Sequence, residues 1–96
     1  MHASIHRYEV TTGSADELAD LAWRLGAMLR QVTGFVAAVA VEDGLGALVT
    51  ISVFEDQTSL AAAHELARGW AAGHRAALGS GPRELANGEV VAQRGL

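Results

Sequence analysis

The chain has 96 residues, half of them hydrophobic, and a formal net charge of −4 at pH 7. A chain of this length can build one hydrophobic core, so we expect a single domain over residues 1–96. Its seven basic residues, all arginine, form no patch that could follow a phosphate backbone, which argues against a nucleic-acid partner. The absence of cysteine excludes disulfides, thiolate nucleophiles and cysteine-ligated metal clusters.

The sequence contains no membrane or export signal that we can identify. No run of about eighteen apolar residues occurs, and the first residues lack a basic segment followed by an apolar one. We therefore expect a cytoplasmic protein without a membrane partner.

The first half of the chain predicts a strand, a helix and a second strand. Residues 4–10 are rich in β-branched and aromatic side chains and lead into a turn at 11–14. Ser14 and Glu17 have the spacing of a capping box, which predicts a helix start. Apolar residues then recur every three or four positions as far as Val32, and Thr33-Gly34 ends the helix before the strand at 35–41.

The second half predicts a hairpin, a helix and a last strand. Residues 48–54 form an apolar run that a short turn at 42–46 joins to the preceding strand. Asp56 or Thr58 can cap a helix that continues to Leu78, where a segment rich in glycine, with Pro82, stops it. Residues 88–93, which include two valines, are predicted as the fourth strand.

This βαββαβ order predicts an α+β, ferredoxin-like fold with a four-stranded antiparallel sheet and both helices on one face. The two middle strands are apolar on both faces, so Val49, Ile51 and Val53 have no cover from their own chain. A second copy of the chain would cover them, which predicts a homodimer through the sheet face, a dimeric α+β barrel. An open-faced monomer is the alternative.

The residues also resemble a known family, the antibiotic biosynthesis monooxygenase-like proteins of the dimeric α+β barrel superfamily. The resemblance rests on residues 4–8, 13–18, 33–35, 52–56 and 88–90, together with Trp70. It implies a pocket between the sheet and the helices. It also implies one of three roles: a small cofactor-independent oxygenase of aromatic polyketides, a haem-degrading enzyme, or a protein without known activity.

Position by position, the resemblance highlights three residues. His6 stands before Arg7, where enzymes of the family often have an asparagine, and Trp70 lies near the family's pocket tryptophan. Haem-degrading members place an iron-ligating histidine further along the second helix, and His74 is the candidate here, at a spacing that does not match. We therefore expect no cofactor, and haem binding or degradation is a minor alternative.

Helical and strand periodicity brings the candidate site residues together. His64 and His74 border the sheet-facing stripe of the second helix, with Trp70 at its edge, while His6 and Tyr8 share one face of the first strand. We expect His6, Tyr8, Trp70 and His74 to meet in one cavity, with His6 and His74 as catalytic bases and Tyr8, Trp70 and His64 as substrate-binding groups. The alternative interpretation is purely structural. The histidines are then core residues that hydrogen-bond to carbonyl groups, and the aromatic side chain fills the space over small alanines.

Metal binding is not predicted, because neither His2 with His6 nor His64 with Glu65 has a third ligand at a recognisable spacing. Two functions remain open at this point. The first is a cofactor-independent monooxygenase-like enzyme that acts on a small aromatic or polyketide-like compound. The second is a non-catalytic small-molecule-binding or stress-associated dimer of the same fold.

Overall fold

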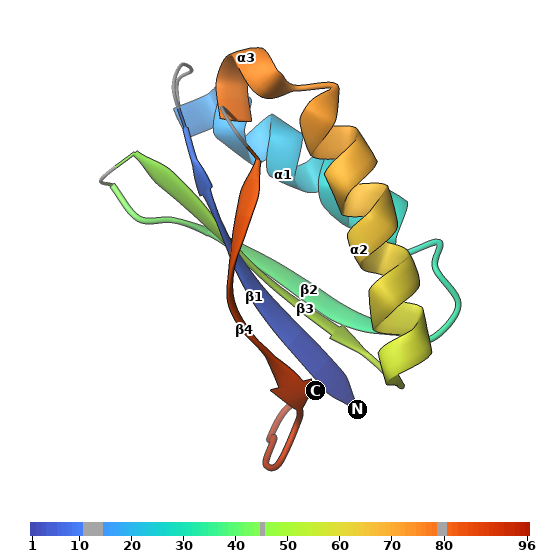
Figure 1. Ribbon diagram of the computed structural model, residues 1–96. Helices are drawn as coiled ribbons and strands as arrows, with labels where there is room; N and C mark the ends of the chain where they lie inside the picture. The colour runs from blue at the N-terminus through green and yellow to red at the C-terminus, as the bar shows by residue number, and fades with distance from the viewer. Residues whose placement is uncertain (11–14, 45, 79–80) are drawn as a thin grey trace.

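A computed structural model of the protein describes residues 1–10, 15–44, 46–78 and 81–96 (Figure 1). Four strands form one sheet in the order β2-β3-β1-β4, and each pair of neighbours is antiparallel. The elements are β1 (His2–Glu9), α1 (Ala15–Leu29), β2 (Phe35–Glu42), β3 (Ala47–Phe54), α2 (Gln57–Ala72), α3 (Arg75–Leu78) and β4 (Pro82–Glu89).

The helices α1 and α2 lie on the same face of the sheet (Figure 1). This is the arrangement expected of a βαββαβ chain with right-handed crossovers, so the predicted ferredoxin-like α+β fold is confirmed. Among the described residues, no helix is both long enough and apolar enough to cross a membrane.

Strand register decides which side chains face the helices. Ser4, His6 and Tyr8 of β1 lie opposite Ser52, Thr50 and Leu48 of β3. Ser4 and Tyr8 are buried against the helical layer, with 1% and 2% exposed. Because side chains alternate along a strand, Ile5 and its partner Ile51 lie on the opposite, open face.

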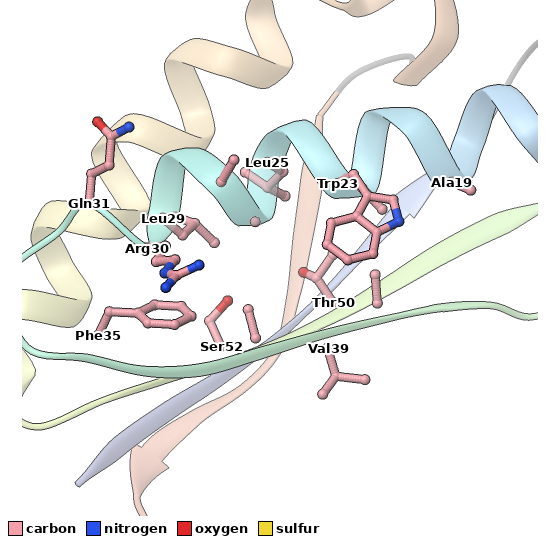
Figure 2. A pocket seen from close by; sticks show the side chains of 15 residues that line it. Ala19, Trp23, Leu25, Leu29, Arg30, Gln31, Phe35, Val39, Thr50 and Ser52 are labelled. Atoms are coloured by element: carbon pink, nitrogen blue, oxygen red, sulfur yellow. The ribbon is translucent and has the colours of Figure 1, made fainter.

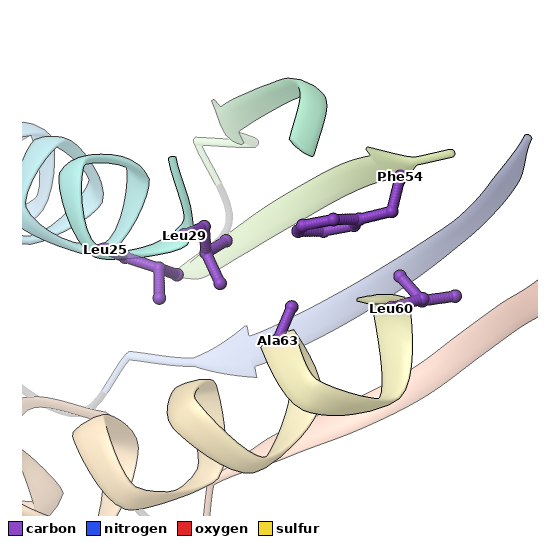
Figure 3. Close-up of a cluster of buried hydrophobic side chains, with 5 residues drawn as sticks. All are labelled: Leu25, Leu29, Phe54, Leu60 and Ala63. Atoms are coloured by element: carbon purple, nitrogen blue, oxygen red, sulfur yellow. The ribbon is translucent and has the colours of Figure 1, made fainter. Parts of the chain in front are cut away.

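The centre of the core lies where both helices meet β3. Phe54 is fully buried there and packs edge to face against Phe35, with ring centroids 5.7 Å apart. Figure 3 shows the buried cluster around it, to which α1 contributes Leu25 and Leu29 and α2 contributes Leu60 and Ala63. This cluster holds both helices against one strand, so it fixes the helical layer over the sheet.

Two predicted boundaries are wrong. The last strand spans Pro82–Glu89 instead of 88–93. It pairs with β1 so that Pro82 lies opposite Tyr8 and Glu89 lies opposite His2. This pairing outweighs the β-propensity of the later valines. The second helix ends at Ala72, where the backbone N–H of Gly73 bonds to carbonyls of the last turn, and the short α3 follows.

The two predicted helix caps have different outcomes. Asp56 caps α2 as predicted, since its Oδ1 accepts a hydrogen bond from the Ser59 backbone N–H at 2.8 Å. The Ser14 cap lies outside the described residues.

Candidate functional site

A cavity of about 850 Å³ lies between α1 and the strands β2 and β3 (Figure 2). Its volume falls within the range of pockets that hold small organic molecules, which is roughly 300–1,000 Å³. The cavity is lined by Ala19, Ala22, Trp23, Leu25, Gly26, Ala27, Leu29, Arg30, Gln31, Phe35, Ala38, Val39, Ala40, Thr50 and Ser52.

Small side chains cause this cavity. On the helix-facing side of the sheet, Ala38 of β2 pairs with Ser52 of β3, and Ala40 pairs with Thr50. These four side chains are short, so they leave part of the space between the sheet and α1 unfilled. On the helix side, α1 adds Gly26 and several alanines at the same place.

The walls and floor of the cavity differ in chemistry. Phe35 and Trp23 provide aromatic surface, and the Trp23 side chain is 79% exposed. Thr50 and Ser52 bring hydroxyl groups from β3 toward the space under α1 (Figure 2). Arg30 also lines the cavity, and none of the ion pairs found in the described part of the chain includes it. An apolar cavity with a few polar groups suits a flat aromatic ligand with a polar substituent.

A histidine pair lies next to this cavity on the same face of the sheet. The rings of His6 and His64 meet edge to face with centroids 4.8 Å apart. His64 Nε2 lies 2.9 Å from the hydroxyl oxygen of Ser4, within hydrogen-bond distance. Burial, followed by the neighbouring His64 ring, lowers the pKa of His6 below its ordinary value of 6.5, and Glu84 opposes this shift. His6 is therefore mostly neutral at pH 7 and can accept a proton.

Glu84 completes this group from the edge strand β4. Its Oε1 lies 3.7 Å from His6 Nε2 and accepts a hydrogen bond from Asn87 Nδ2 at 2.9 Å. In the part of the chain that the structure describes, a metal ion could be held by His6, His64 and Glu84, whose ligand atoms all lie within 4.8 Å of one another.

A second aromatic group lies further along α2. Trp70 packs edge to face against Tyr8, with ring centroids 6.2 Å apart, and lies 4.8 Å from the ring of His74. His74 Nδ1 is 2.8 Å from the backbone carbonyl oxygen of Trp70, so this ring nitrogen is engaged at the end of the helix. Burial raises the pKa of Tyr8 to about 12, which keeps its phenol neutral at physiological pH.

The strand register connects the cavity to the histidines. Thr50 on the cavity floor is the direct cross-strand partner of His6, and Ser52 is the partner of Ser4. Side chains paired in this way have Cβ atoms about 4.5–5.5 Å apart. A ligand that rests on Thr50 would therefore have the His6 imidazole as a lateral neighbour.

The structure divides the predicted site residues into two groups. It brings His6 together with His64, and Trp70 together with Tyr8 and His74. These five side chains are not among those that line the cavity under α1. The cavity lies between the sheet and a helix, as the family resemblance implied, but its lining residues were not predicted. Their signal in the sequence was Ala38 and Ala40 of β2, which lie opposite the Ser52 and Thr50 hydroxyls.

The fold is shared with several solved structures. A protein of unknown function from Nitrosomonas europaea is 22% identical with a TM-score of 0.79, over 97% of this chain and 91% of that one. A putative antibiotic biosynthesis monooxygenase from the same organism is 12% identical with a TM-score of 0.72, over 96% and 100%. SnoaB, a cofactor-independent oxygenase from Streptomyces nogalater, is 23% identical with a TM-score of 0.66, over 99% and 95%.

These likenesses concern the fold. No protein-family model matches the chain, and no curated protein matches its sequence. The resemblance found in the sequence is thus confirmed as a shared architecture, that of the antibiotic biosynthesis monooxygenase proteins.

Proposed function

From the premise that this chain has the fold of the antibiotic biosynthesis monooxygenases, we propose that it is a small cofactor-independent monooxygenase-like protein. Its substrate is a planar aromatic or polyketide-like compound that binds in the cavity under α1. One observation carries this proposal: Thr50 on the cavity floor lies directly opposite His6, the neutral histidine beside the cavity.

The reaction begins with a proton transfer to His6. A phenolic ketone with an acidic methylene group loses a proton to the neutral imidazole and becomes an electron-rich anion. That anion is the reductant of dioxygen. Oxidation of the methylene to a carbonyl takes one atom of dioxygen into the product and releases the other as water, so no further reductant is needed.

Other side chains position the substrate and the base. The hydroxyls of Thr50 and Ser52 can hydrogen-bond a phenol or carbonyl of the ligand, and Phe35 offers a flat apolar wall. His64 fixes the ring of His6 through their edge-to-face contact. Tyr8, Trp70 and His74 form the adjoining packed group, and a direct role in catalysis or binding for them stays a prediction.

Oxygen consumption with anthrone, a three-ring ketone with an acidic methylene, tests this function. Replacement of His6 by Ala should lower turnover by about 10²–10⁴-fold and leave ligand affinity within about tenfold, as for the loss of a general base. Because His6 must be neutral, the rate should fall as the pH drops through its lowered pKa. Equal turnover by wild type and His6→Ala would contradict the role of His6.

A non-catalytic binding protein is the second candidate. It is supported by the packing of the second aromatic group, in which Tyr8 is 2% exposed and His74 Nδ1 is engaged by a backbone carbonyl. This candidate predicts that anthrone quenches the fluorescence of Trp23 at the cavity, without oxygen uptake. Quenching that persists in Trp70→Phe and disappears in Trp23→Phe would locate the ligand under α1.

We also propose that two copies of the chain associate through the open face of the sheet. Val39, whose side chain points away from α1 (Figure 2), and Val41 are 54% and 48% exposed there, beside their partners Ile51 and Val49. Arg7, on the same face, is neutralised by Glu9 and Asp43 at 2.7 and 3.1 Å. Such an apolar face with paired charge suits burial against a second copy.

Light scattering tests this association. Wild type should have the mass of a dimer at micromolar concentrations, and Ile51→Asp should have the mass of one chain, because it places an unpaired carboxylate in the interface. A wild-type mass near 10 kDa would contradict the proposed dimer.

A further inference from the structure

We propose that His6, His64 and Glu84 form a binding site for a divalent first-row transition-metal ion. These residues come from β1, α2 and β4, and their ligand atoms all lie within 4.8 Å of one another. Sequence spacing gives no indication of the set, since the three positions lie far apart in the chain.

The donor atoms suit such an ion. Two imidazole nitrogens and one carboxylate oxygen are a common ligand set for Zn²⁺ and Fe²⁺. Metal–ligand bonds of about 2.0–2.2 Å place neighbouring donor atoms roughly 3–3.5 Å apart. His6 Nε2 and Glu84 Oε1 are already 3.7 Å apart, and the ligand atoms of all three residues lie within 4.8 Å of one another. The Glu84 side chain is 48% exposed, so its carboxylate can move the short distance needed to bind the same ion as the two histidines.

Glu84 is held by a further side chain, because its Oε1 accepts a hydrogen bond from Asn87 Nδ2 at 2.9 Å. The buried Ser4 hydroxyl lies 2.9 Å from His64 Nε2, so it can orient this ring when Nδ1 is the nitrogen that binds the ion. Metal sites typically have such outer partners, which orient the ligands and raise affinity.

The backbone of the edge strand also contributes. The register between β1 and β4 shifts between Ile5 and His6, so that Ala86 pairs with Ile5 while Glu84 pairs with His6. An irregularity of this kind redirects side chains, and it is frequent beside functional sites. Here the shift sets Glu84 directly opposite His6, on the face that His64 covers.

Three protein ligands leave at least one coordination position for water or a ligand. A metal ion on His6 would take the lone pair that the proposed reaction needs for proton transfer. His6 therefore cannot bind the metal ion and accept a proton at the same time. Addition of the metal should inhibit the oxidation that the metal-free protein catalyses.

The test is a calorimetric titration of the chelator-treated, full-length protein with Zn²⁺, without any substrate. We expect one ion per chain in the wild type and at least about tenfold weaker binding in His64→Ala and in Glu84→Gln. His2→Ala is the matched control, since His2 lies on the same strand outside the set and its loss should leave affinity unchanged. Bound Co²⁺ should give a visible absorption spectrum typical of nitrogen and oxygen ligands, which Glu84→Gln should alter.

Glu84 is an exposed side chain on an edge strand, so its replacement by Gln should leave the fold intact, and circular dichroism can verify this. Absence of Zn²⁺ binding by wild type, or equal affinity of wild type and Glu84→Gln, would overturn the proposal. So would equal losses in His2→Ala and His64→Ala. The titration contains no oxidisable compound, so its result is independent of the oxygen-consumption assay.

Discussion

The two halves of the helix-covered face are packed in opposite ways. Where α2 and α3 meet β1 and β3, a buried cluster is formed in which each side chain is at most 2% exposed: Tyr8, Leu48, Ala71 and Leu78. Under α1, the strands β2 and β3 present alanines, Thr50 and Ser52, and a cavity of about 850 Å³ remains (Figure 2). The same sheet therefore supports a filled half and a hollow half.

Side-chain volume accounts for this difference. One core cluster packs both helices against the same sheet. In the filled half β1 contributes the large side chain of Tyr8, whereas in the hollow half β2 contributes only the methyl groups of Ala38 and Ala40. Stability and ligand binding should therefore depend on different residues, and the following substitutions separate the two.

The largest expected effect is on stability, in the filled half. Tyr8→Ala removes a side chain that is 2% exposed, and it should lower the free energy of unfolding by about 3–5 kcal/mol. Trp23→Ala is the comparison in the hollow half, where the side chain is 79% exposed, and its cost should stay within about 0.5 kcal/mol. Urea denaturation measures both, and similar losses for the two variants would contradict the division.

The next effect is on binding. Ala40→Phe places a ring in the cavity and should weaken the binding of anthrone by more than about tenfold, while stability changes little because the space is open. Ala62→Phe, at an exposed position on α2, is the control for the added ring. Fluorescence titration measures affinity, and unchanged binding in Ala40→Phe would show that the ligand lies elsewhere.

A smaller effect concerns the floor of the cavity. Thr50→Val keeps the shape of the side chain and removes its hydroxyl, which should cost about 1 kcal/mol of binding, or roughly fivefold in affinity, for a ligand with a phenol. A ligand of the same shape without the phenol should bind equally to both proteins. If Thr50→Val weakens the binding of both ligands to the same extent, the Thr50 hydroxyl does not hydrogen-bond the phenol.

The smallest expected effect is the pH dependence at the start of α2. The hydrogen bond that Asp56 accepts from the Ser59 backbone N–H lowers the pKa of this carboxyl below its ordinary value of 3.8. Because the folded-state pKa is the lower one, its contribution is complete above the unfolded-state pKa and disappears as the pH falls through the folded-state value.

Asp56→Asn retains a capping group but does not titrate. Between pH 6 and pH 3, wild type should therefore lose slightly more thermal stability than Asp56→Asn. An equal loss of thermal stability in the two proteins over this pH range would show that protonation of Asp56 does not affect stability.

Much of the fold followed from local patterns. The period of apolar residues predicted the two long helices, and the Asp56 cap and the β2–β3 hairpin were correct because short-range chemistry determines them. The two-residue period also predicted that His6 and Tyr8 share one face of β1. Strand alternation is a property of the backbone alone, so the sequence by itself determined these features.

The tertiary structure decided the rest. The bounds of β4 depend on pairing with a strand some eighty residues earlier, which local propensity does not encode. The cavity exists because alanines of β2 meet small residues of α1 across a gap, and its position beside His6 depends on cross-strand register. Glu84 reaches the two histidines through the register shift between β1 and β4. Distances between remote segments arise from packing of the whole chain, so only the folded structure determines them.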